Sequence, residues 1–427
     1  MRIFGNYSIL TKIIILSSII IFAGCNENMT IQSDNITTNR QSYSNDIKLV
    51  KKSINETDLG PVPNQYIVIF KDKWDGRISE AISKESKLYV NNKIESYGIS
   101  KESIKSRYEN AFRGFTAKLT NKELKLIEKD PSVKYIVQDH KYKALDDFSN
   151  VEINQTKLGQ GVNNVQQPQI TPWGITRVGG PYDGSQSSVG KAFIMDTGVA
   201  NSWDLNWVDG VSFVPYEGEN DLNGHGTFVA GIIAAIDNNI NVVGVAAGAT
   251  VESVKILNQN GEVYLSWFLD GVDYIAIEAE NGDVVNMSFG FLTPLPDPAN
   301  TIRTTIMNIA DSGVMFTIAA GNYGIDAANV FPANINHSNV YTLSAFDQND
   351  NFATAFSNFG NPPIDYSEPG VEIISLSNND GVTGPIDGTS FAAPHAAGIL
   401  LMDGAIQSGG YINNDVDGNP DIIGVGN

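Results

Sequence analysis

The segment that decides the fold is Gly388-Thr-Ser390-Phe-Ala-Ala-Pro-His-Ala-Ala-Gly398. Small residues dominate it, and helical spacing continues from 389 to 403, so it predicts the start of a well-packed helix. Gly388 lets neighbouring backbone approach closely. Pro394 is expected within the first turn, where a missing N–H matters least. Ser390 is therefore expected near a helix N-terminus, in the positive field of free backbone N–H groups.

Two further segments place a reactive side chain among small residues. Asp196-Thr-Gly directly follows the apolar run 191–195, and Gly224-His225-Gly-Thr-Phe-Val-Ala-Gly231 opens a second helical stretch. A serine hydroxyl is a weak nucleophile and needs an adjacent base. A histidine titrates in the right range, and a carboxylate fixes its tautomer. Ser390, His225 and Asp196 are therefore candidates for nucleophile, general base and orienting acid.

Each candidate also has a purely structural interpretation. Asp196 alone could be a turn or cap residue, His225 a histidine at a helix start, and Ser390 an N-cap. Their joint occurrence in the order Asp, His, Ser is what favours the catalytic interpretation.

The chain has four histidines, so the base can be tested by elimination. His140 lies in the front part of the chain, and His337 lies in a polar loop. His395 is five residues beyond Ser390, about 140° round the same helix, and is expected to pack structurally. His225 remains as the base.

Apolar strands alternate with helical stretches from Thr171 onward. The strand-like segments are 191–195, 253–257, 283–289, 314–319 and 340–344, and the helical segments are 225–236, 264–280, 300–312 and 389–403. This alternation predicts an α/β fold, with a mostly parallel sheet and helices on both faces. Reactive groups in such sheets gather at the carboxyl ends of strands.

A second unit is predicted over residues 64–145. Strand patterns at 65–70, 111–119 and 133–137 enclose helical spacing at 76–99 and a short helix that ends before Pro131. Thr120 and Glu123 make a capping box at the start of this short helix. Strand, helix, strand, helix, strand predicts a small α+β domain.

The rest of the chain is divided by composition. We expect a signal segment at 1–25, a flexible Asn- and Ser-rich tether at 26–63, and a polar linker at 146–170 that contains a processing site. The unit at 64–145 lies between the tether and the linker, and a catalytic domain follows at 171–427.

Charge separates the two halves of the chain. Five of the 28 Lys and Arg residues and 30 of the 48 Asp and Glu residues follow residue 150, so the front carries +5 and the back −25. An acidic domain of this kind repels nucleic acid, which we exclude as a partner. The opposite charges could favour docking of the front on the back, or the acidic face could simply be solvated.

The start of the chain predicts secretion. Basic residues precede an apolar run at 13–22, which is short for a membrane span and is followed by Ala-Gly-Cys25. Cys25 is the only cysteine, so no intrachain disulfide can form. Phe-Ala-Gly-Cys resembles a bacterial lipobox, although leucine is usual where Phe22 stands. A lipid anchor on Cys25 is predicted, with an ordinary cleaved signal as the alternative. The membrane is otherwise not an expected partner.

The three segments around Ser390, His225 and Asp196 resemble the subtilisin-like (subtilase) serine proteases in sequence and order. Phe-Arg-Gly-Phe-Thr-Ala-Lys-Leu119 and Val133-Lys-Tyr-Ile-Val resemble the inhibitor-type propeptide of that family, with a ferredoxin-like fold. The resemblance implies a serine endopeptidase that cleaves protein and peptide substrates. It also implies an acyl-enzyme intermediate and no catalytic cofactor. It also implies a secreted zymogen that removes its own propeptide, which acts as intramolecular chaperone and inhibitor.

The resemblance implies further site residues. Asn322, in Ala-Ala-Gly-Asn322, matches the asparagine of the family's oxyanion hole. Ser288-Phe289-Gly290 matches its substrate-backbone segment, where leucine is frequent in place of Phe289; the larger ring could reshape the pocket.

The family often binds structural calcium. The acidic loop of Asp415, Asp417 and Asp421 supplies candidate ligands, with a solvated turn as the alternative because the EF-hand glycine and glutamate are missing.

Two rival functions remain. A catalytically dead subtilisin-like binding module would keep the fold without the reaction. An acyl hydrolase of the α/β-hydrolase type would need a Gly-x-Ser-x-Gly elbow before the histidine, and the chain order contradicts this.

Overall fold

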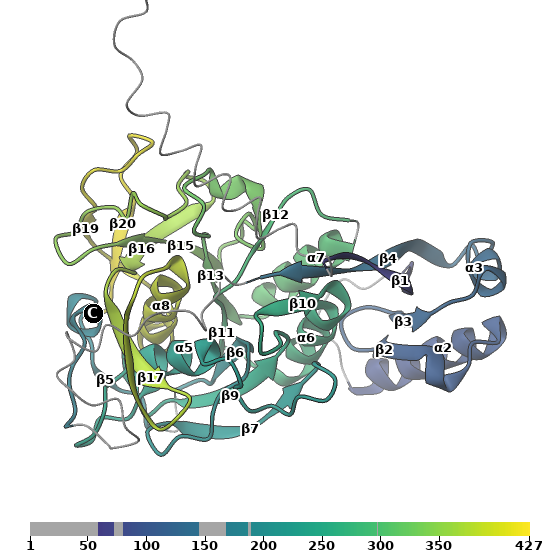
Figure 1. Ribbon diagram of the computed structural model, residues 1–427, viewed down its shortest axis with the longest axis horizontal. Helices are drawn as coiled ribbons and strands as arrows, with labels where there is room; N and C mark the ends of the chain where they lie inside the picture. The colour runs from purple at the N-terminus through teal and green to yellow at the C-terminus, as the bar shows by residue number, and fades with distance from the viewer. Residues whose placement is uncertain (1–58, 72–79, 145–167, 187–188, 297) are drawn as a thin grey trace, which may run out of the picture. The chain divides into compact units, whose positions relative to one another are not determined.

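The computed structural model describes residues 59–71, 80–144, 168–186, 189–296 and 298–427 (Figure 1). They all belong to one compact unit that comprises residues 52–427. The predicted signal segment with Cys25 lies outside the described residues, as do most of the predicted tether and most of the linker. Within the described ranges, no helix combines the length and the apolar character needed to cross a membrane.

The front of the described chain forms an antiparallel sheet with helices packed on it. Its elements are β1 (Gly60–Phe70), α2 (Glu80–Tyr97), η1 (Lys101–Ser103), β2 (Ile104–Tyr108), β3 (Gly114–Lys118), α3 (Asn121–Ile127) and β4 (Val133–Lys143). The strands lie in the order β4-β1-β3-β2, which is the ferredoxin-like arrangement. Val68 and Phe70 of β1 share a core with Val90 and Ile94 of α2 and Ile127 of α3. The predicted small α+β domain is confirmed.

The capping box is present at the start of α3. The Thr120 hydroxyl accepts the N–H of Glu123 at 3.3 Å, and the Glu123 carboxylate accepts the N–H of Thr120 at 2.7 Å. Strand β2 was not predicted, because Lys-Ser-Arg separates the apolar residues at its two ends. Strand β4 continues to Lys143 instead of ending at Val137, because its second half pairs with a strand of the catalytic part.

A nine-stranded sheet organises the rest of the chain, in the order β19-β20-β16-β15-β13-β11-β6-β9-β7. Its strands are β6 (Ala192–Asp196), β7 (Asn206–Ser212), β9 (Thr250–Lys255), β11 (Val284–Met287), β13 (Met315–Ala319), β15 (Val340–Phe346), β16 (Ile364–Pro369), β19 (Gln407–Tyr411) and β20 (Ile422–Val425). The pairings from β7 through β20 are parallel, and β19 runs antiparallel to β20. The predicted mostly parallel sheet is confirmed.

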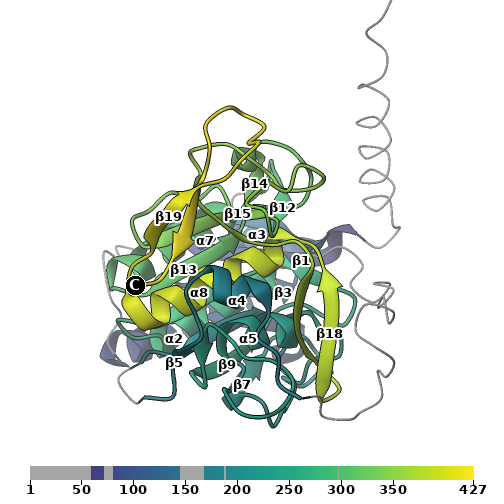
Figure 2. The ribbon, with the colours of Figure 1, turned by 90° about the vertical axis from the view of Figure 1, so that its left-hand side faces the viewer.

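Helices cover both faces of this sheet because the central strands are apolar on both sides. Phe193 and Met195 of β6 share a core with α6 (Leu265–Glu278) and α7 (Pro298–Asp311). Ala192 and Ile194 share the opposite core with α5 (His225–Ala234) and α8 (Thr389–Asp403). Figure 2 shows α8 from the side on which it covers the sheet.

The remaining elements are short. They are α4 (Trp173–Arg177), β5 (Tyr182–Asp183), β8 (Ala246–Ala247), β10 (Glu262–Tyr264), β12 (Phe291–Leu292), η3 (Ala327–Asn329), β14 (Val330–Phe331), β17 (Ile373–Ser377) and β18 (Gly381–Ile386). Three of them position the site: β10 joins the sheet of the front domain through β4, and β17 and β18 form a hairpin that leads into α8.

Candidate active site

Asp196 and His225 meet at the carboxyl end of the central strands. Asp196 is the last residue of β6, His225 is the first residue of α5, and both are buried. Nδ1 of His225 lies 2.8 and 3.0 Å from the two carboxylate oxygens of Asp196. Because a carboxylate only accepts hydrogen bonds, Nδ1 carries the proton and Nε2 is the basic nitrogen.

Small residues bring the start of α5 against β6. Gly224 precedes His225 with φ 107°, a conformation that favours glycine. A Cβ atom at Gly226 would lie 3.2 Å from Cβ of Asp196, so a larger residue would push helix and strand apart. The hydroxyl of Thr197 accepts the Gly226 N–H at 3.0 Å, and the Thr197 N–H donates to Asp196 at 2.7 Å.

Ser390 is the second residue of α8 and is 8% exposed. Its hydroxyl donates to the carbonyl oxygen of Ser288 at 2.9 Å, and the Ser288 hydroxyl donates to the carbonyl oxygen of Ser390 at 2.7 Å. Pro394 is the sixth residue of the helix, so its expected place in the first turn was wrong. Because proline has no N–H, Pro394 cannot donate to the Ser390 carbonyl, and Ser288 supplies that hydrogen bond instead.

Asn322 follows β13 and is oriented by the start of α8. Its Oδ1 atom accepts from the backbone N–H of Thr389 at 2.9 Å and from the Thr389 hydroxyl at 2.8 Å. These two donors identify the oxygen end of the amide, so the Nδ2 donor points the other way. A Cβ atom at Gly388 would lie 3.5 Å from Nδ2, which places this donor beside the residues that precede Ser390.

The segment 288–290 follows β11, beside Ser390. Phe289 is 2% exposed, and its ring packs against Phe268 with ring centroids 5.2 Å apart and against Phe291 at 5.8 Å. The ring therefore belongs to the core under this segment, and its backbone is what the segment offers. The N–H of Gly290 points at the carbonyl oxygen of Ala144 at 3.5 Å.

The end of β4 lies as an added strand beside β10. The antiparallel register pairs Lys141, Tyr142 and Lys143 with Tyr264, Val263 and Glu262 in turn. Ala144 continues this pairing: its N–H donates to the carbonyl oxygen of Gly261 at 2.9 Å, while its own carbonyl faces Gly290. An extended peptide thus fits between β10 and the segment 288–290 through main-chain hydrogen bonds.

Acidic side chains of the catalytic part hold the front domain. Asp273 of α6 accepts the backbone N–H groups of residues 109 to 111, at 2.6 Å for Ala111. Burial raises the pKa of Asp273 to about 7. Lys141 forms an ion pair of 2.8 Å with Glu262. Asp273 has no motif around it, because it is a single acid on a helix, and so it could not be found from the sequence pattern.

The other histidines are engaged away from Ser390. His395 is fully buried, donates from Nδ1 to the Phe391 carbonyl at 2.8 Å, and has its pKa lowered to about 4 by burial. His337 lies 3.0 Å from Asp311, and His140 contacts the Gln138 carbonyl at 2.8 Å on β4.

The acidic loop near the C-terminus does not gather its carboxylates. Asp415 and Asp417 accept backbone N–H groups of their own loop, and the side chain of Asp421 is turned inward to accept the Ser344 hydroxyl at 2.5 Å. Over the described residues, no three His, Cys, Asp or Glu side chains cluster in a way that could hold a metal ion.

A different group of oxygens lies around Asp204. One carboxylate oxygen of this residue accepts the Asn238 amide at 2.7 Å, and the other is buried without a partner. Nε2 of the Gln169 amide donates to the Ile236 carbonyl at 3.0 Å and lies 3.5 Å from the Val242 carbonyl. Burial raises the pKa of Asp204 to about 6. The carboxylate and the backbone carbonyls are oxygen ligands of the kind that calcium prefers. Such a set has no spacing of acids by which sequence could find it.

Comparison with known proteins identifies two families along the chain. Residues 132–403 match the Subtilase family, and residues 65–145 match Peptidase inhibitor I9. The first match spans more than half of the chain and contains Asp196, His225 and Ser390.

Several curated proteases are similar to the chain. The Thermostable alkaline protease of Halalkalibacterium halodurans is 33% identical over 348 residues, which cover 79% of this chain and 86% of that protein. M-protease of Shouchella clausii is 34% identical over 67% of this chain and 68% of its own length. Subtilisin BL of Lederbergia lenta is 38% identical over 55% of this chain and 84% of its own length. The chain therefore belongs to the subtilase family of serine endopeptidases, and an inhibitor I9 propeptide domain stands in front of its catalytic domain.

Proposed function

We propose that the protein is a secreted serine endopeptidase, made as a zymogen, in which Ser390 attacks peptide bonds with His225 as general base. The contact of His225 Nδ1 with the Asp196 carboxylate, at 2.8 and 3.0 Å, carries this proposal. It leaves Nε2 as a base at the carboxyl end of the sheet. Asp196 holds this tautomer and stabilises the imidazolium that forms when Nε2 takes a proton.

The acylation step uses the groups around Ser390. Its hydroxyl turns from the Ser288 carbonyl toward His225, gives its proton to Nε2, and forms a C–O bond to the substrate carbonyl. The oxygen that becomes negative accepts from the Ser390 N–H and from Nδ2 of Asn322. The C–N bond then breaks, the leaving amine takes the proton from His225, and an ester on Ser390 remains.

Deacylation repeats these roles with water. Water gives a proton to His225 and attacks the ester carbonyl, and the same two donors hold the oxyanion. The bond to Ser390 Oγ breaks, and the proton returns from His225 to that oxygen. No cofactor takes part in either step.

Substrates bind as extended strands. The backbone of β10 and of the segment 288–290 supplies main-chain hydrogen bonds on both sides of the peptide. The end of β4, which holds this place in the precursor, supports the proposal because it pairs with β10 as a main-chain ladder, to which the Lys141–Glu262 ion pair is added. Protein and peptide substrates are therefore the partners of this groove.

The front domain is proposed to act as chaperone and inhibitor until it is removed. Its last strand lies in the substrate groove and leads into the linker at 146–170, where we place the autocatalytic cut. The lipid anchor proposed at Cys25 lies upstream of that cut, so maturation would also release the enzyme from the cell envelope.

A structural calcium ion is proposed at Asp204, with Gln169, Asn238 and the carbonyls of Ile236 and Val242. The buried carboxylate oxygen without a partner supports this site. A calcium ion there would be the positive partner that this carboxylate oxygen lacks. It would also tie the N-terminal segment of the catalytic domain to the loop after α5.

Expression of wild-type precursor beside Ser390→Ala tests the function. We expect the wild type to lose its front domain and to react with a serine-directed fluorophosphonate, and Ser390→Ala to remain full-length and unlabelled. Ser408→Ala, on the exposed strand β19, is the matched control and should behave as wild type. Equal processing in Ser390→Ala would overturn self-cleavage, and absence of labelling in wild type would favour the inactive binding module.

A further inference from the structure

Lys255 is a buried cation in an acidic domain. It ends β9, it is one of five basic residues after residue 150, and its side chain is 0% exposed. A buried ammonium group is costly unless it is paired and hydrogen-bonded. Its Nζ atom donates to the carbonyl oxygen of Thr197 and lies 3.2 Å from a carboxylate oxygen of Glu217.

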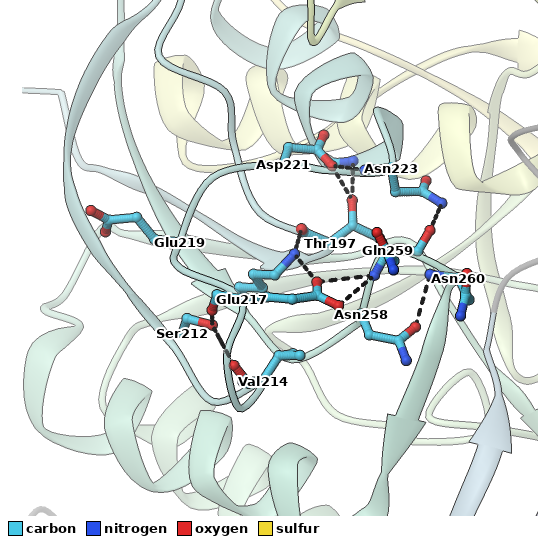
Figure 3. Close-up of polar contacts among 12 residues, drawn as sticks. Thr197, Ser212, Val214, Glu217, Glu219, Asp221, Asn223, Asn258, Gln259 and Asn260 are labelled. Carbon is cyan, nitrogen blue, oxygen red and sulfur yellow. Dashed lines mark hydrogen bonds and ion pairs between the residues drawn. The ribbon is translucent and has the colours of Figure 1, made fainter.

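Glu217 extends this pair to the peptide-binding edge. Its two carboxylate oxygens accept the backbone N–H of Gln259 at 3.3 and 3.1 Å, while the Asn223 amide donates to the Gln259 carbonyl at 2.8 Å (Figure 3). Both backbone groups of Gln259 are thus engaged. Two residues later, the carbonyl of Gly261 is the acceptor for the N–H of Ala144.

Thr197 extends the pair in the other direction, to the catalytic acid and base. Its N–H donates to Asp196, and its hydroxyl donates to Asp221 at 2.9 Å. Asp221 also accepts the Gly224 N–H at 2.8 Å and both the N–H and the hydroxyl of Thr227, so it binds the start of α5 to the same corner. The buried ammonium therefore lies between this corner and the edge strand.

The segment 258–261 needs such an attachment. Its sequence is Asn-Gln-Asn-Gly, and within it Oδ1 of Asn258 accepts the backbone N–H groups of Asn260 and Glu262. These bonds shape the turn without locating it in the domain. Glu217 and Asn223 attach it from outside, and Lys255 holds the carboxylate of Glu217 in place.

We propose that Lys255 and Glu217 are positioning residues that hold the edge segment 258–264 in register with the Asp196–His225 pair. The inference rests on the proposed function, because it takes this edge as the place where substrate backbone binds. Lys255 touches neither substrate nor reacting atoms. The pair determines how well an extended peptide is aligned, and short substrates that do not reach the edge are indifferent to it.

Substrate length supplies the test. Glu217→Gln is expressed as the full-length precursor, the mature enzyme is isolated, and a tetrapeptide amide is compared with an ester of one acylated amino acid. We expect KM for the tetrapeptide to rise about tenfold, the size of one charge-assisted hydrogen bond, with kcat within about twofold. Both constants for the ester should stay within about twofold of wild type.

Glu219→Gln is the matched control. Glu219 lies two residues away on the same loop and accepts the Gly210 N–H at 2.7 Å, away from the Lys255 contacts (Figure 3). The Glu219→Gln variant should have the same ratio of kcat/KM for the tetrapeptide and the ester as wild type. Lys255→Met with Glu217→Leu replaces the pair by apolar groups, which are compatible with folding. This double variant should retain the wild-type melting temperature within a few degrees and show the same loss toward the tetrapeptide.

Three results would overturn the inference: an unchanged KM for the tetrapeptide in folded Glu217→Gln, an equal loss of kcat toward both substrates, or failure of both variants to give mature enzyme. The first would mean that the pair does not align the edge, the second that it serves the catalytic groups, and the third that it serves folding. A Ser390→Ala enzyme that still hydrolyses the ester would instead overturn the proposed function, so the two failures are distinguishable.

Discussion

The front domain and the catalytic domain differ in how far apart in sequence their decisive residues lie. Strands β1 to β4 and their helices close a sheet within residues 60–143. In the catalytic domain, Asp196, His225 and Ser390 come from three elements spread over almost 200 residues. A domain built from near neighbours is suited to fold first, because closing short loops costs little entropy. The two regions meet where β4 pairs with β10, so the domain that we expect to fold first lies along the edge proposed to bind substrate.

The largest expected effect is a loss of kcat caused by a change in the catalytic region alone. Asp196→Asn keeps the shape of the side chain but removes the charge that fixes the His225 tautomer, so kcat should fall by about 10⁴ and the precursor should stay uncleaved. Asp209→Asn, on the exposed part of β7, serves as the control. Steady-state rates with a peptide amide measure the effect, and a loss of less than tenfold would contradict the assignment.

Removal of the side-chain oxyanion donor should come next. Asn322→Ala is expected to lower kcat by about 10²–10³ with KM little changed, since the donor acts on the charge that develops during attack. The melting temperature should be recorded as well, because the same side chain accepts from Thr389. Should KM rise while kcat is retained, Asn322 would be a binding residue and not an oxyanion donor.

The affinity of the front domain for the catalytic domain should depend on pH. Burial raises the pKa of Asp273 from 3.8 to about 7 in the docked state, so docking binds a proton. Docking is then strongest below pH 3.8 and weakens by up to about tenfold per unit as the pH rises to 7. Burial raises the pKa of Asp139 and Asp270 in the same direction.

Recovery of activity from the processed complex at pH 4 to 8 measures this dependence. Asp273→Asn should flatten it, and Asp403→Asn, at the far end of α8, is the control. A wild-type complex that releases activity equally across this range would remove Asp273 from the inhibitory contact.

Calcium should stabilise the catalytic region. A chelator is expected to lower its melting temperature by about 5–10 °C, from about 2.7 kcal/mol of binding free energy at a hundredfold excess over Kd. Asp204→Asn should melt lower than wild type and no longer respond to the chelator, whereas Asp417→Asn should respond fully. A full response in Asp204→Asn would exclude this site.

The smallest effect belongs to the front domain. Thr120→Ala removes the capping box of α3 and should cost about 1 kcal/mol of stability in that domain alone. Maturation should slow, and the kcat of the mature enzyme should be unchanged. Ser132→Ala, at a nearby position outside the helix, is the reference for loss of stability in this domain. A changed kcat of the mature enzyme in Thr120→Ala would contradict the separation of the two regions.

Motifs with strong local requirements were predictable. The apolar run before Asp196, the glycines around His225 and the small residues after Ser390 each place one side chain at a strand end or helix start. The capping box of Thr120 and Glu123 is of the same kind. These signals occupy a few consecutive residues, so sequence spacing carries them.

Residues that depend on distant partners were not predictable. Asp204 accepts from Asn238, Gln169 donates to the Ile236 carbonyl 67 residues away, and Asp273 accepts backbone N–H groups some 160 residues away. Strand β2 was missed because its pattern does not alternate. The helix start at Thr389 was predicted, but Pro394 is the sixth residue from that start and lies in the second turn, so the expected place in the first turn was wrong.

Sequence alone determined the family, the α/β order of elements and the three side chains proposed for catalysis, because chemistry at a helix start or strand end needs particular residues next to one another. Tertiary structure decided what surrounds them: the reciprocal Ser288–Ser390 hydrogen bonds, the strand of the front domain in the groove, and the burial of Lys255 beside Glu217. Burial and pairing join segments far apart in the chain, and the electrostatic cost of a buried charge depends on partners that no local pattern records.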